Sequence, residues 1–409
     1  MKNHYNTIDL FAGCGGLMDG FERNPSFHTV ACVEWEHEPC NTLRKRLKEK
    51  YDHKNADNEV VRFDMQRTEE LFSGFKTEDY GEHSGLDALT KGKKIDVIIG
   101  GPPCQAYSIA GRIRDEHGMK NDYRNYLFES YVKVVNRYRP KFFVFENVQG
   151  LLSACPDGEP ITAKIINAFA DINYTIATNL KDCLFDVADY GIPQHRKRVI
   201  IFGINTDLFN MVEQSSILES FYGYIKSHKQ QHITVNQAIG DLPKFYPLAV
   251  PQKQDGRNYS HTPFESGVPN HTPRFHSLRD IKAFKLLSED IESGRCEYTS
   301  IEKIKELYTQ LTGKKSNIHK YYVLRRDEPS NTIPAHLYKD GMRHIHPDSE
   351  QSRSITVREA ARLQTFDDDF IFTGSMGAQY KMIGNAVPPR FAALLADATN
   401  YILKTYDHE

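Results

Sequence analysis

The sequence predicts an α/β protein with a doubly wound, mainly parallel β-sheet and a second, smaller and irregular domain. Up to residue 204, short apolar strands alternate with helical patterns, as expected for a sheet covered on both faces. Between residues 205 and 345 this alternation is lost, and it returns afterwards. We therefore expect one domain from residues 1–204 and 346–409, and a smaller one from residues 205–345.

The composition is that of a globular protein, with 39% hydrophobic and 26% charged residues in 409. No segment approaches the ~20 consecutive apolar residues of a membrane span, and a strand begins too early to leave room for a signal peptide. The seven cysteines lie at no zinc-ligand spacing. We therefore expect a cytoplasmic protein with reduced thiols, without disulfides and without a metal site.

The net charge of −2 does not by itself indicate a nucleic-acid-binding protein. Residues 205–345 carry a small excess of Lys and Arg over Asp and Glu. Such an excess permits a local basic groove, and it is equally typical of solvated surfaces.

The first strand is expected over residues 7–11, followed by a glycine-rich turn, residues 12–16, and a helix over residues 17–23. Glycines at this place let a ligand approach the backbone and the positive end of the helix. The dinucleotide fingerprint requires a further glycine where Met18 stands, which disfavours a nicotinamide or flavin cofactor.

Two later strands end in acidic residues. The strand over residues 28–33 is followed by Glu34 and Trp35, and the strand over residues 60–64 ends at Asp64. An acid about 20 residues after a glycine turn commonly binds ribose hydroxyls. Trp35 could stack on an adenine, although a packing role is the alternative.

The strand over residues 95–100 runs into a turn of two glycines and two prolines that presents Cys104. A thiol at the carboxyl end of a parallel strand is a nucleophile if its surroundings favour the thiolate. The alternative is a small buried residue beside a kinked loop. Residues 106–122 contain two glycines and several cations, which suggests a lid over an anionic substrate.

A helix over residues 123–137 precedes a buried strand that ends at Glu146, at the same sheet edge as Cys104. A carboxyl group there should be partly desolvated and suited to donating a proton; the alternative is a capping or salt-bridged surface glutamate. Arg196 and Arg198 lie two residues apart, so on an extended chain they share a face and could orient Glu146. The alternative is a basic strand end without a role.

The remaining elements lie on either side of the irregular segment. We expect a helix over residues 158–172 and strands over residues 174–180 and 199–204. Thr356 and Glu359 form a capping box that opens a helix, and prolines at 388 and 389 are placed to start the last helix. Its apolar face should pack on the first domain; this face consists of Phe391, Leu394, Leu395, Ala398 and Ile402.

Six of these segments resemble, in order, the motifs of DNA (cytosine-5)-methyltransferases. They are DLFAGCGG (9–16), GGPPCQ (100–105), ENV (146–148), QHRKR (194–198), REAARLQ (358–364) and GNAVPP (384–389). Six motifs in register are far more specific than any one of them. The resemblance implies the S-adenosylmethionine-dependent methyltransferase fold, S-adenosylmethionine as methyl donor, S-adenosylhomocysteine as product and cytosine in duplex DNA as acceptor. Residues 205–345 would be the target-recognition domain.

The resemblance also implies roles for single residues. Cys104 would be the nucleophile, Glu146 the acid on the base, and Arg196 and Arg198 supporting cations, with no metal required. Gln105 and Ser108 would approach the DNA. The methyl-donor pocket would be lined by Phe11, Gly13, Gly15, Glu34, Trp35, Asp64, Pro102, Leu127, Asn385 and Val387.

The implied chemistry requires the cytosine to be flipped out of the duplex, because its ring atoms cannot be reached inside the stack. We expect a monomer that acts on nucleoid DNA and contacts no membrane. It would be the modification enzyme of a restriction–modification system, with a restriction endonuclease for the same site, or an orphan counterpart.

Two other functions remain open at this point. A tRNA-methylating member of the same superfamily shares nearly all these motifs, although the long segment over residues 205–345 favours sequence-specific duplex DNA. A non-catalytic homologue that binds DNA or a partner would be expected to lack Cys104, Glu146 or the glycine turn, and all three are present. Adenine or exocyclic-amine methylation is disfavoured, because that chemistry needs no cysteine.

Overall fold

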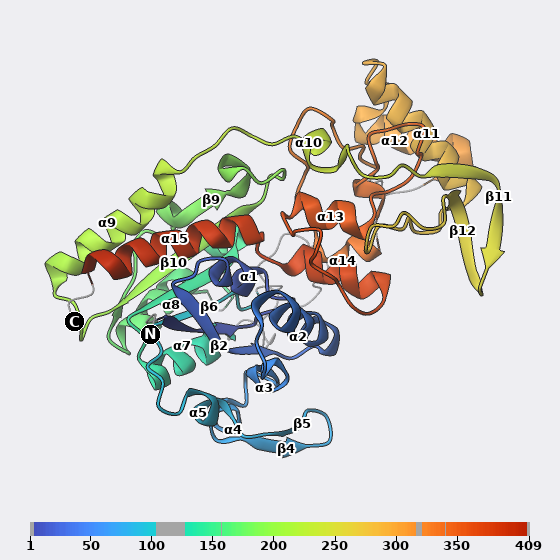
Figure 1. Cartoon of the computed structure of the whole chain (residues 1–409). Coiled ribbons are helices and arrows are strands. Elements are labelled where there is room, and N and C mark those ends of the chain that lie inside the picture. Colours follow the sequence, from blue (N-terminus) through green and yellow to red (C-terminus); the bar gives the residue numbers. More distant parts are fainter. Residues whose placement is uncertain (1–3, 104–126, 157, 316–320, 340, 407–409) are drawn as a thin grey trace. The chain divides into compact units, whose positions relative to one another are not determined.

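The computed structural model describes residues 4–103, 127–156, 158–315, 321–339 and 341–406. The chain forms two compact units, which are coloured along the sequence in Figure 1. The first contains Met1–Tyr190, Arg196–Gln231 and Ala386–Glu409, and the second contains Gly191–His195 and His232–Asn385. These boundaries differ from the expected ones, since residues 205–231 belong to the first unit and residues 346–385 to the second.

The first unit is built on an eight-stranded sheet with the order β3-β2-β1-β6-β7-β10-β8, and β9 pairs with β10. Strands β1, β2, β3, β6 and β7 run parallel, whereas β10 is antiparallel to its neighbours, which confirms the mainly parallel sheet. The strands are β1 (Tyr5–Leu10), β2 (Phe27–Glu34), β3 (Val60–Arg62), β6 (Val97–Gly100), β7 (Phe142–Val148), β8 (Tyr174–Thr175), β9 (Leu184–Asp186) and β10 (Lys197–Asn205).

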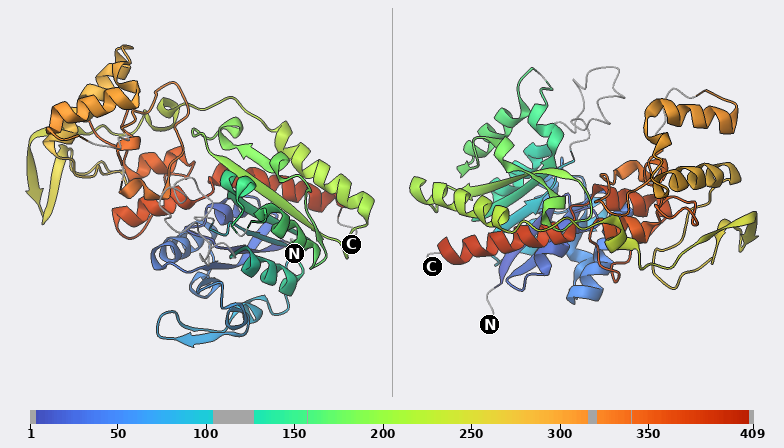
Figure 2. Two further views of the ribbon diagram at one scale, coloured as in Figure 1. Left: turned by 180° about the vertical axis from the view of Figure 1, so that it is seen from behind. Right: turned by 90° about the horizontal axis from the view of Figure 1, so that it is seen from above.

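Helices cover both faces of this sheet (Figure 2). The helices of the first unit are α1 (Gly16–Glu22), α2 (His37–Tyr51), α3 (Ala56–Glu59), α4 (Thr68–Ser73), α5 (Leu86–Thr90), α7 (Leu127–Tyr138), α8 (Ile161–Ala170), α9 (Met211–Ser227) and α15 (Pro389–Tyr406). Phe143 of β7 stacks on Phe169 of α8, with ring centroids 4.2 Å apart. On the other face Phe202 of β10 stacks on Phe221 of α9 at 3.8 Å. This two-sided burial explains why the strands read as continuous apolar runs.

The last helix packs back on the first unit, as predicted. Gly20 of α1 lies so close to Ala392 of α15 that a side chain at Gly20 would clash. Phe391, Leu395, Ala398 and Ile402 are buried, whereas Leu394 is only half-buried.

One strand prediction was wrong in its extent. The strand expected over residues 174–180 ends after Thr175, and a 3₁₀ turn (Leu180–Cys183) follows. The side chain of Asn179 accepts a hydrogen bond from the Lys181 N–H and so caps this turn, which competes with extended backbone. The segment over residues 73–94 contains α5 and a hairpin of β4 (Phe75–Thr77) and β5 (Gly81–His83).

The second unit has no large sheet among its described residues. It contains α10 (Val235–Ile239), the hairpin β11 (Tyr246–Gln254) and β12 (Arg257–Thr262), α11 (Leu278–Glu292), α12 (Ile301–Thr312), α13 (Val357–Leu363) and α14 (Met376–Asn385). The capping box of α13 is confirmed, because Thr356 Oγ1 accepts from the Glu359 N–H and Glu359 Oε2 accepts from the Thr356 N–H. Among the described residues, no helix is both long and apolar enough to cross a membrane.

Candidate active site

The candidate site lies where the strand order of the sheet reverses. The chain builds outward from β1 through β2 to β3 and then returns to place β6 beside β1 on its other side. The carboxyl ends of β1 and β6 therefore open on the switch point at which α/β sheets bind their ligands. Both glycine turns singled out in the sequence follow these two strands.

The first turn needs glycine for its backbone conformation. Gly13 and Gly15 have φ angles of 56° and 93°, and Phe11, the residue after β1, has a φ of 57°. A Cβ on Gly13 would meet no atom within 4 Å, so the backbone angle, and not a lack of room, favours glycine there. Next to the turn, Gly16 packs directly on the backbone of Val387.

Two buried carboxylates hold this turn in place. Asp9 of β1 accepts a hydrogen bond from the Met18 N–H at 3.2 Å, and burial raises the pKa of Asp9 well above its ordinary value. Glu34, at the end of β2, accepts from the Gly13 N–H at 2.9 Å through Oε2. Its Oε1 accepts from the amides of Trp35 and Glu36 at 2.9 and 2.8 Å. Burial also raises the pKa of Glu34, and these backbone hydrogen bonds oppose that shift.

Within the described part of the chain, the other residues predicted to bind the donor have no hydrogen bond to this turn that would place them there directly. Trp35 is 52% exposed, so its ring is free to meet a flat ligand. Asp64 follows β3 and accepts a hydrogen bond from the Gln66 N–H. Leu127 and Pro102 are buried. Asn385 is exposed and ends α14 in the second unit.

The second turn is pinned to the strands on both sides of β6. A Cβ on Gly100 would clash with the carbonyl oxygen of Leu10, and a Cβ on Gly101 would lie 2.7 Å from Glu146 Oε2. Asn147 Nδ2 donates to the carbonyl oxygen of Pro102 at 3.2 Å. Cys104, Gln105 and Ser108, and the loop predicted as a lid, lie outside the described residues.

Glu146 and Arg198 meet at the end of β7. Arg198 Nε lies 2.7 Å from Glu146 Oε1, and both side chains are largely buried. The contact is an ion pair without the alignment of a hydrogen bond. Burial lowers the pKa of Arg198, and the charge of Glu146 partly restores it. The structure thus brings Glu146, Arg198 and the Gly101 turn together.

Arg196 has a different partner. Its guanidinium is buried and donates to the Ala386 carbonyl oxygen at 3.0 Å, while its backbone N–H donates to Asp186 Oδ1. Burial, and then the neighbouring Arg198, lower the pKa of Arg196. Arg196 therefore fastens the chain before α15, whereas Arg198 forms an ion pair with Glu146.

Two glutamines in the recognised motifs have a role that the sequence reasoning missed. Gln194 is fully buried in the second unit, where it donates to Gln364 Oε1 at 3.0 Å and accepts from the Ile333 N–H at 2.8 Å. Gln364 in turn donates to the Ile383 carbonyl oxygen at 2.7 Å. A neutral amide with both donor and acceptor groups suits such a bridging position. The sequence signal for this role was that an uncharged glutamine stands at the end of each of two otherwise charged motifs, Gln194 in residues 194–198 and Gln364 in residues 358–364.

The fold and the glycine turns are those of an α/β protein whose candidate ligand site lies at the carboxyl edge of its sheet. A family model for C-5 cytosine-specific DNA methylases matches residues 5–400. The type II methyltransferase M.Bpa9945I of Bacillus paralicheniformis is 32% identical, over 97% of this chain and 99% of that protein. M1.HphI of Haemophilus parahaemolyticus, also a type II methyltransferase, is 30% identical over 96% of this chain and 85% of that protein.

Solved structures share the fold. A prophage-encoded protein of Escherichia coli, described as a DNA modification methyltransferase, superposes with a TM-score of 0.61 at 24% identity, over 98% of this chain and 99% of that one. The methyltransferase EhMeth of Entamoeba histolytica superposes with a TM-score of 0.54 at 16% identity, over 98% of both chains. The chain belongs to the C-5 cytosine-specific DNA methylase family, so it is a DNA cytosine-5 methyltransferase.

Proposed function

We propose that this enzyme transfers a methyl group from S-adenosylmethionine to carbon 5 of a cytosine flipped out of duplex DNA, through a covalent adduct with Cys104. The observation that carries the proposal is the position of Glu146. Its Oε1 is held by Arg198, and its Oε2 faces Gly101, three residues before Cys104. A carboxyl group so placed can meet a base that is attacked by the thiol of the same turn.

The residues around the first glycine turn fit the methyl donor. A carboxylate offers about four acceptor sites, and three backbone amides bind Glu34. One site is left for a ribose hydroxyl, and the exposed ring of Trp35 can stack on the adenine. The pocket would be completed by Phe11, Gly13, Gly15, Asp64, Pro102, Leu127, Asn385 and Val387. When bound, S-adenosylmethionine supplies an electrophilic sulfonium methyl group, and S-adenosylhomocysteine is the product.

The chain's own residues would make carbon 5 reactive. The Cys104 thiolate forms a bond to carbon 6 while Glu146 protonates ring nitrogen 3, and the displaced electron pair makes carbon 5 nucleophilic. After methyl transfer a base removes the proton from carbon 5, the carbon–sulfur bond breaks, and ring nitrogen 3 returns its proton to Glu146, which restores the aromatic ring, the thiolate and the acid. Arg198 holds one oxygen of Glu146 so that the other carries the proton. Gln105 and Ser108 would contact the DNA beside the flipped base, and Arg196 acts through the chain that it fastens.

A covalent trap tests this mechanism. Fluorine at carbon 5 cannot leave as a cation, so the methylated adduct cannot break down. We expect a protein–DNA band on a denaturing gel that requires S-adenosylmethionine, a 5-fluorocytosine target and an intact Cys104, and that is absent for Cys104→Ala. If an enzyme that methylates the ordinary duplex forms no such band, thiolate addition is wrong. Replacing the duplex with tRNA tests the alternative substrate.

We propose further that the second unit reads the DNA sequence, mainly through residues 232–345. Base readout needs side chains set against groove edges, and this region combines exposed side chains with the protruding hairpin of β11 and β12 (Figure 1). Exchanging this region with that of a relative of different specificity should move methylation to the relative's site. An active chimaera that keeps the original site would contradict the assignment.

We propose that the enzyme is a monomer that acts on nucleoid DNA in the cytoplasm, without membrane contact. The names of the relatives, which are type II methyltransferases, support a role in restriction–modification. It modifies the site of a partner restriction endonuclease or acts as an orphan enzyme.

A further inference from the structure

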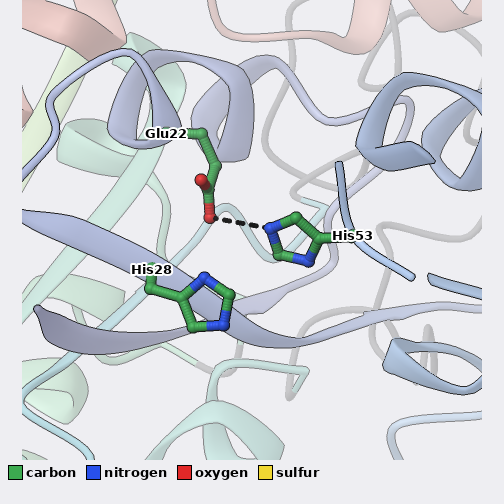
Figure 3. Close-up of side chains that lie close together, drawn as sticks. All are labelled: Glu22, His28 and His53. Atoms are coloured by element: carbon green, nitrogen blue, oxygen red, sulfur yellow. Dashed lines mark ion pairs between the residues drawn. The ribbon is translucent and has the colours of Figure 1, made fainter. Parts of the chain in front are cut away.

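A cluster of three titratable side chains lies in the first unit, away from the glycine turns. Glu22 ends α1, His28 is the second residue of β2, and His53 lies in the loop after α2. Figure 3 shows the three side chains turned toward one another, and one ligand-type atom from each lies within 4.8 Å of the others. We propose that this cluster binds a divalent metal ion of the zinc type, which ties α1, β2 and the loop after α2 together.

The donor set suits such an ion. Two imidazole nitrogens and one carboxylate oxygen form a ligand set that zinc accepts, with metal–ligand distances of about 2.0–2.2 Å and a water in the fourth position. His53 Nε2 already lies 3.5 Å from Glu22 Oε1, the separation of two ligands on one tetrahedral ion. His28 is partly exposed, so the ion and its water have access from solvent.

The orientation of His53 is the one that a metal-binding histidine needs. Its Nδ1 lies 2.7 Å from Glu59 Oε2, at the end of α3. Histidines that bind a metal through one ring nitrogen commonly donate the other N–H to a carboxylate, which fixes the tautomer and the ring. Glu59 thus leaves Nε2 directed at Glu22 and available to the ion.

The charges of the cluster favour a cation. Glu22 and Glu59 both lie against the ring of His53, at 3.5 and 2.7 Å from its two nitrogens. A divalent ion bound by the neutral imidazoles would neutralise the charge of these two carboxylates.

The location argues for a structural ion. His28 and Glu34 lie at opposite ends of β2, which separates them by roughly 20 Å at the rise of a strand. The ion would therefore take no part in methyl transfer, and the expectation that the reaction itself needs no metal is not affected. The ligands come from separate elements, which is why no metal-ligand spacing is visible in the sequence.

His28 is the residue to change, because it distinguishes a metal site from a simple salt bridge. Among the described residues its ring makes no hydrogen bond, and it stacks on the ring of His53 with the centroids 4.8 Å apart. The variant His28→Gln removes a metal ligand but keeps the contacts of His53 with Glu22 and Glu59. The exposed His37 supplies the matched control His37→Gln.

The experiment uses untagged, full-length protein stripped of metal and titrated with zinc against a chromogenic chelator. We expect wild type and His37→Gln to bind one more equivalent than His28→Gln. Zinc should raise the thermal midpoint of the first two by about 3–5 °C more than that of the His28 variant. Cobalt bound at this site should lack the thiolate charge-transfer band that binding to cysteines produces.

Equal stoichiometry and equal thermal shifts for all three proteins would overturn the proposal, as would a thiolate band for the equivalent that depends on His28. The metal-free midpoints show whether His28→Gln folds as wild type does. If it does not, His28→Asn takes its place, since either amide removes the imidazole ligand.

Discussion

Two buried glutamates, Glu146 in the first unit and Glu359 in the second, each lie against an arginine, yet the two carboxylates are bound very differently. Glu359 contacts Arg353 through two hydrogen bonds, from Nη1 to Oε2 at 2.7 Å and from Nη2 to Oε1 at 2.6 Å. It also accepts from the Thr356 N–H at 2.7 Å, and His346 Nε2 lies 3.5 Å away. Burial alone would raise the pKa of Glu359, but the charge of Arg353 holds it well below its ordinary value.

Glu146 has far fewer partners among the described residues. Arg198 approaches one oxygen at 2.7 Å, in a poorly aligned ion pair, and the other oxygen faces the glycine turn. A Cβ at position 101 would lie 2.7 Å from Oε2, so a larger residue there would displace the Glu146 carboxylate.

The difference indicates what each carboxylate can do. A carboxylate whose acceptor sites are all filled by fixed donors is part of the scaffold, because releasing it would strand a buried cation. A carboxylate with one oxygen held and the other facing a turn remains available to a substrate. The predictions that follow test this contrast between Glu146 and Glu359.

Glu146→Gln should have the largest effect. The amide keeps the shape of the side chain but cannot donate a full proton to the base, so we expect kcat to fall by about 10²–10⁴-fold. DNA affinity should change little, and the loss in thermal midpoint should be smaller than for Glu359→Gln, because Glu146 has one ion pair with Arg198 whereas Glu359 has two hydrogen bonds with Arg353. Single-turnover methylation of a duplex, together with a binding titration, measures both. A methylation rate near that of wild type would mean that Glu146, like Glu359, has a structural role and does not donate the proton.

Glu359→Gln should act on stability instead. It leaves the fully buried Arg353 without a charged partner, which typically costs about 3–5 kcal/mol in free energy of unfolding. Denaturant unfolding measures this loss, and the methylation rate per folded molecule should stay close to that of wild type. If Glu359→Gln is as stable as wild type but methylates DNA much more slowly, the proposed difference between the two glutamates is wrong.

His346 should make the free energy of unfolding depend on pH, and we expect this effect to be smaller than that of Glu359→Gln. Burial lowers the pKa of His346 to about 3, well below the ordinary 6.5. As the pH falls, His346 is therefore protonated in the unfolded chain before it is protonated in the folded protein. The stability that the protein has above pH 6.5 is lost progressively as the pH falls toward 3. In the first unit the sign is opposite, since the stability from His53 is fully present below pH 6.5 and is lost as pH rises through 9.

The variant His346→Gln should make unfolding less sensitive to acid. Between pH 7 and pH 5 the wild type should lose about 1–2 kcal/mol more than this variant. Denaturant melts at the two pH values provide the comparison, with the exposed His228→Gln as control. Equal losses in all three proteins would mean that His346 is not held neutral.

The sequence by itself determined the features that depend on neighbours along the chain. The glycine turn after β1, the capping box of Thr356 and Glu359 and the proline at the start of α15 were all predicted, because each is set by backbone angles or hydrogen bonds within a few residues. The placement of Glu34 and Glu146 at strand ends was predicted too, since apolar runs mark the strands.

Only the tertiary structure decided which of these local features meet. It placed β6 beside β1 and β10 antiparallel to β7. In this arrangement Arg198 forms an ion pair with Glu146, whereas Arg196 donates a hydrogen bond to the Ala386 carbonyl oxygen. It also assigned residues 346–385 to the second unit and gathered Glu22, His28 and His53 into one cluster. These contacts join residues far apart in the chain, and they form because burying both faces of the sheet brings the elements together, which leaves no local pattern in the sequence.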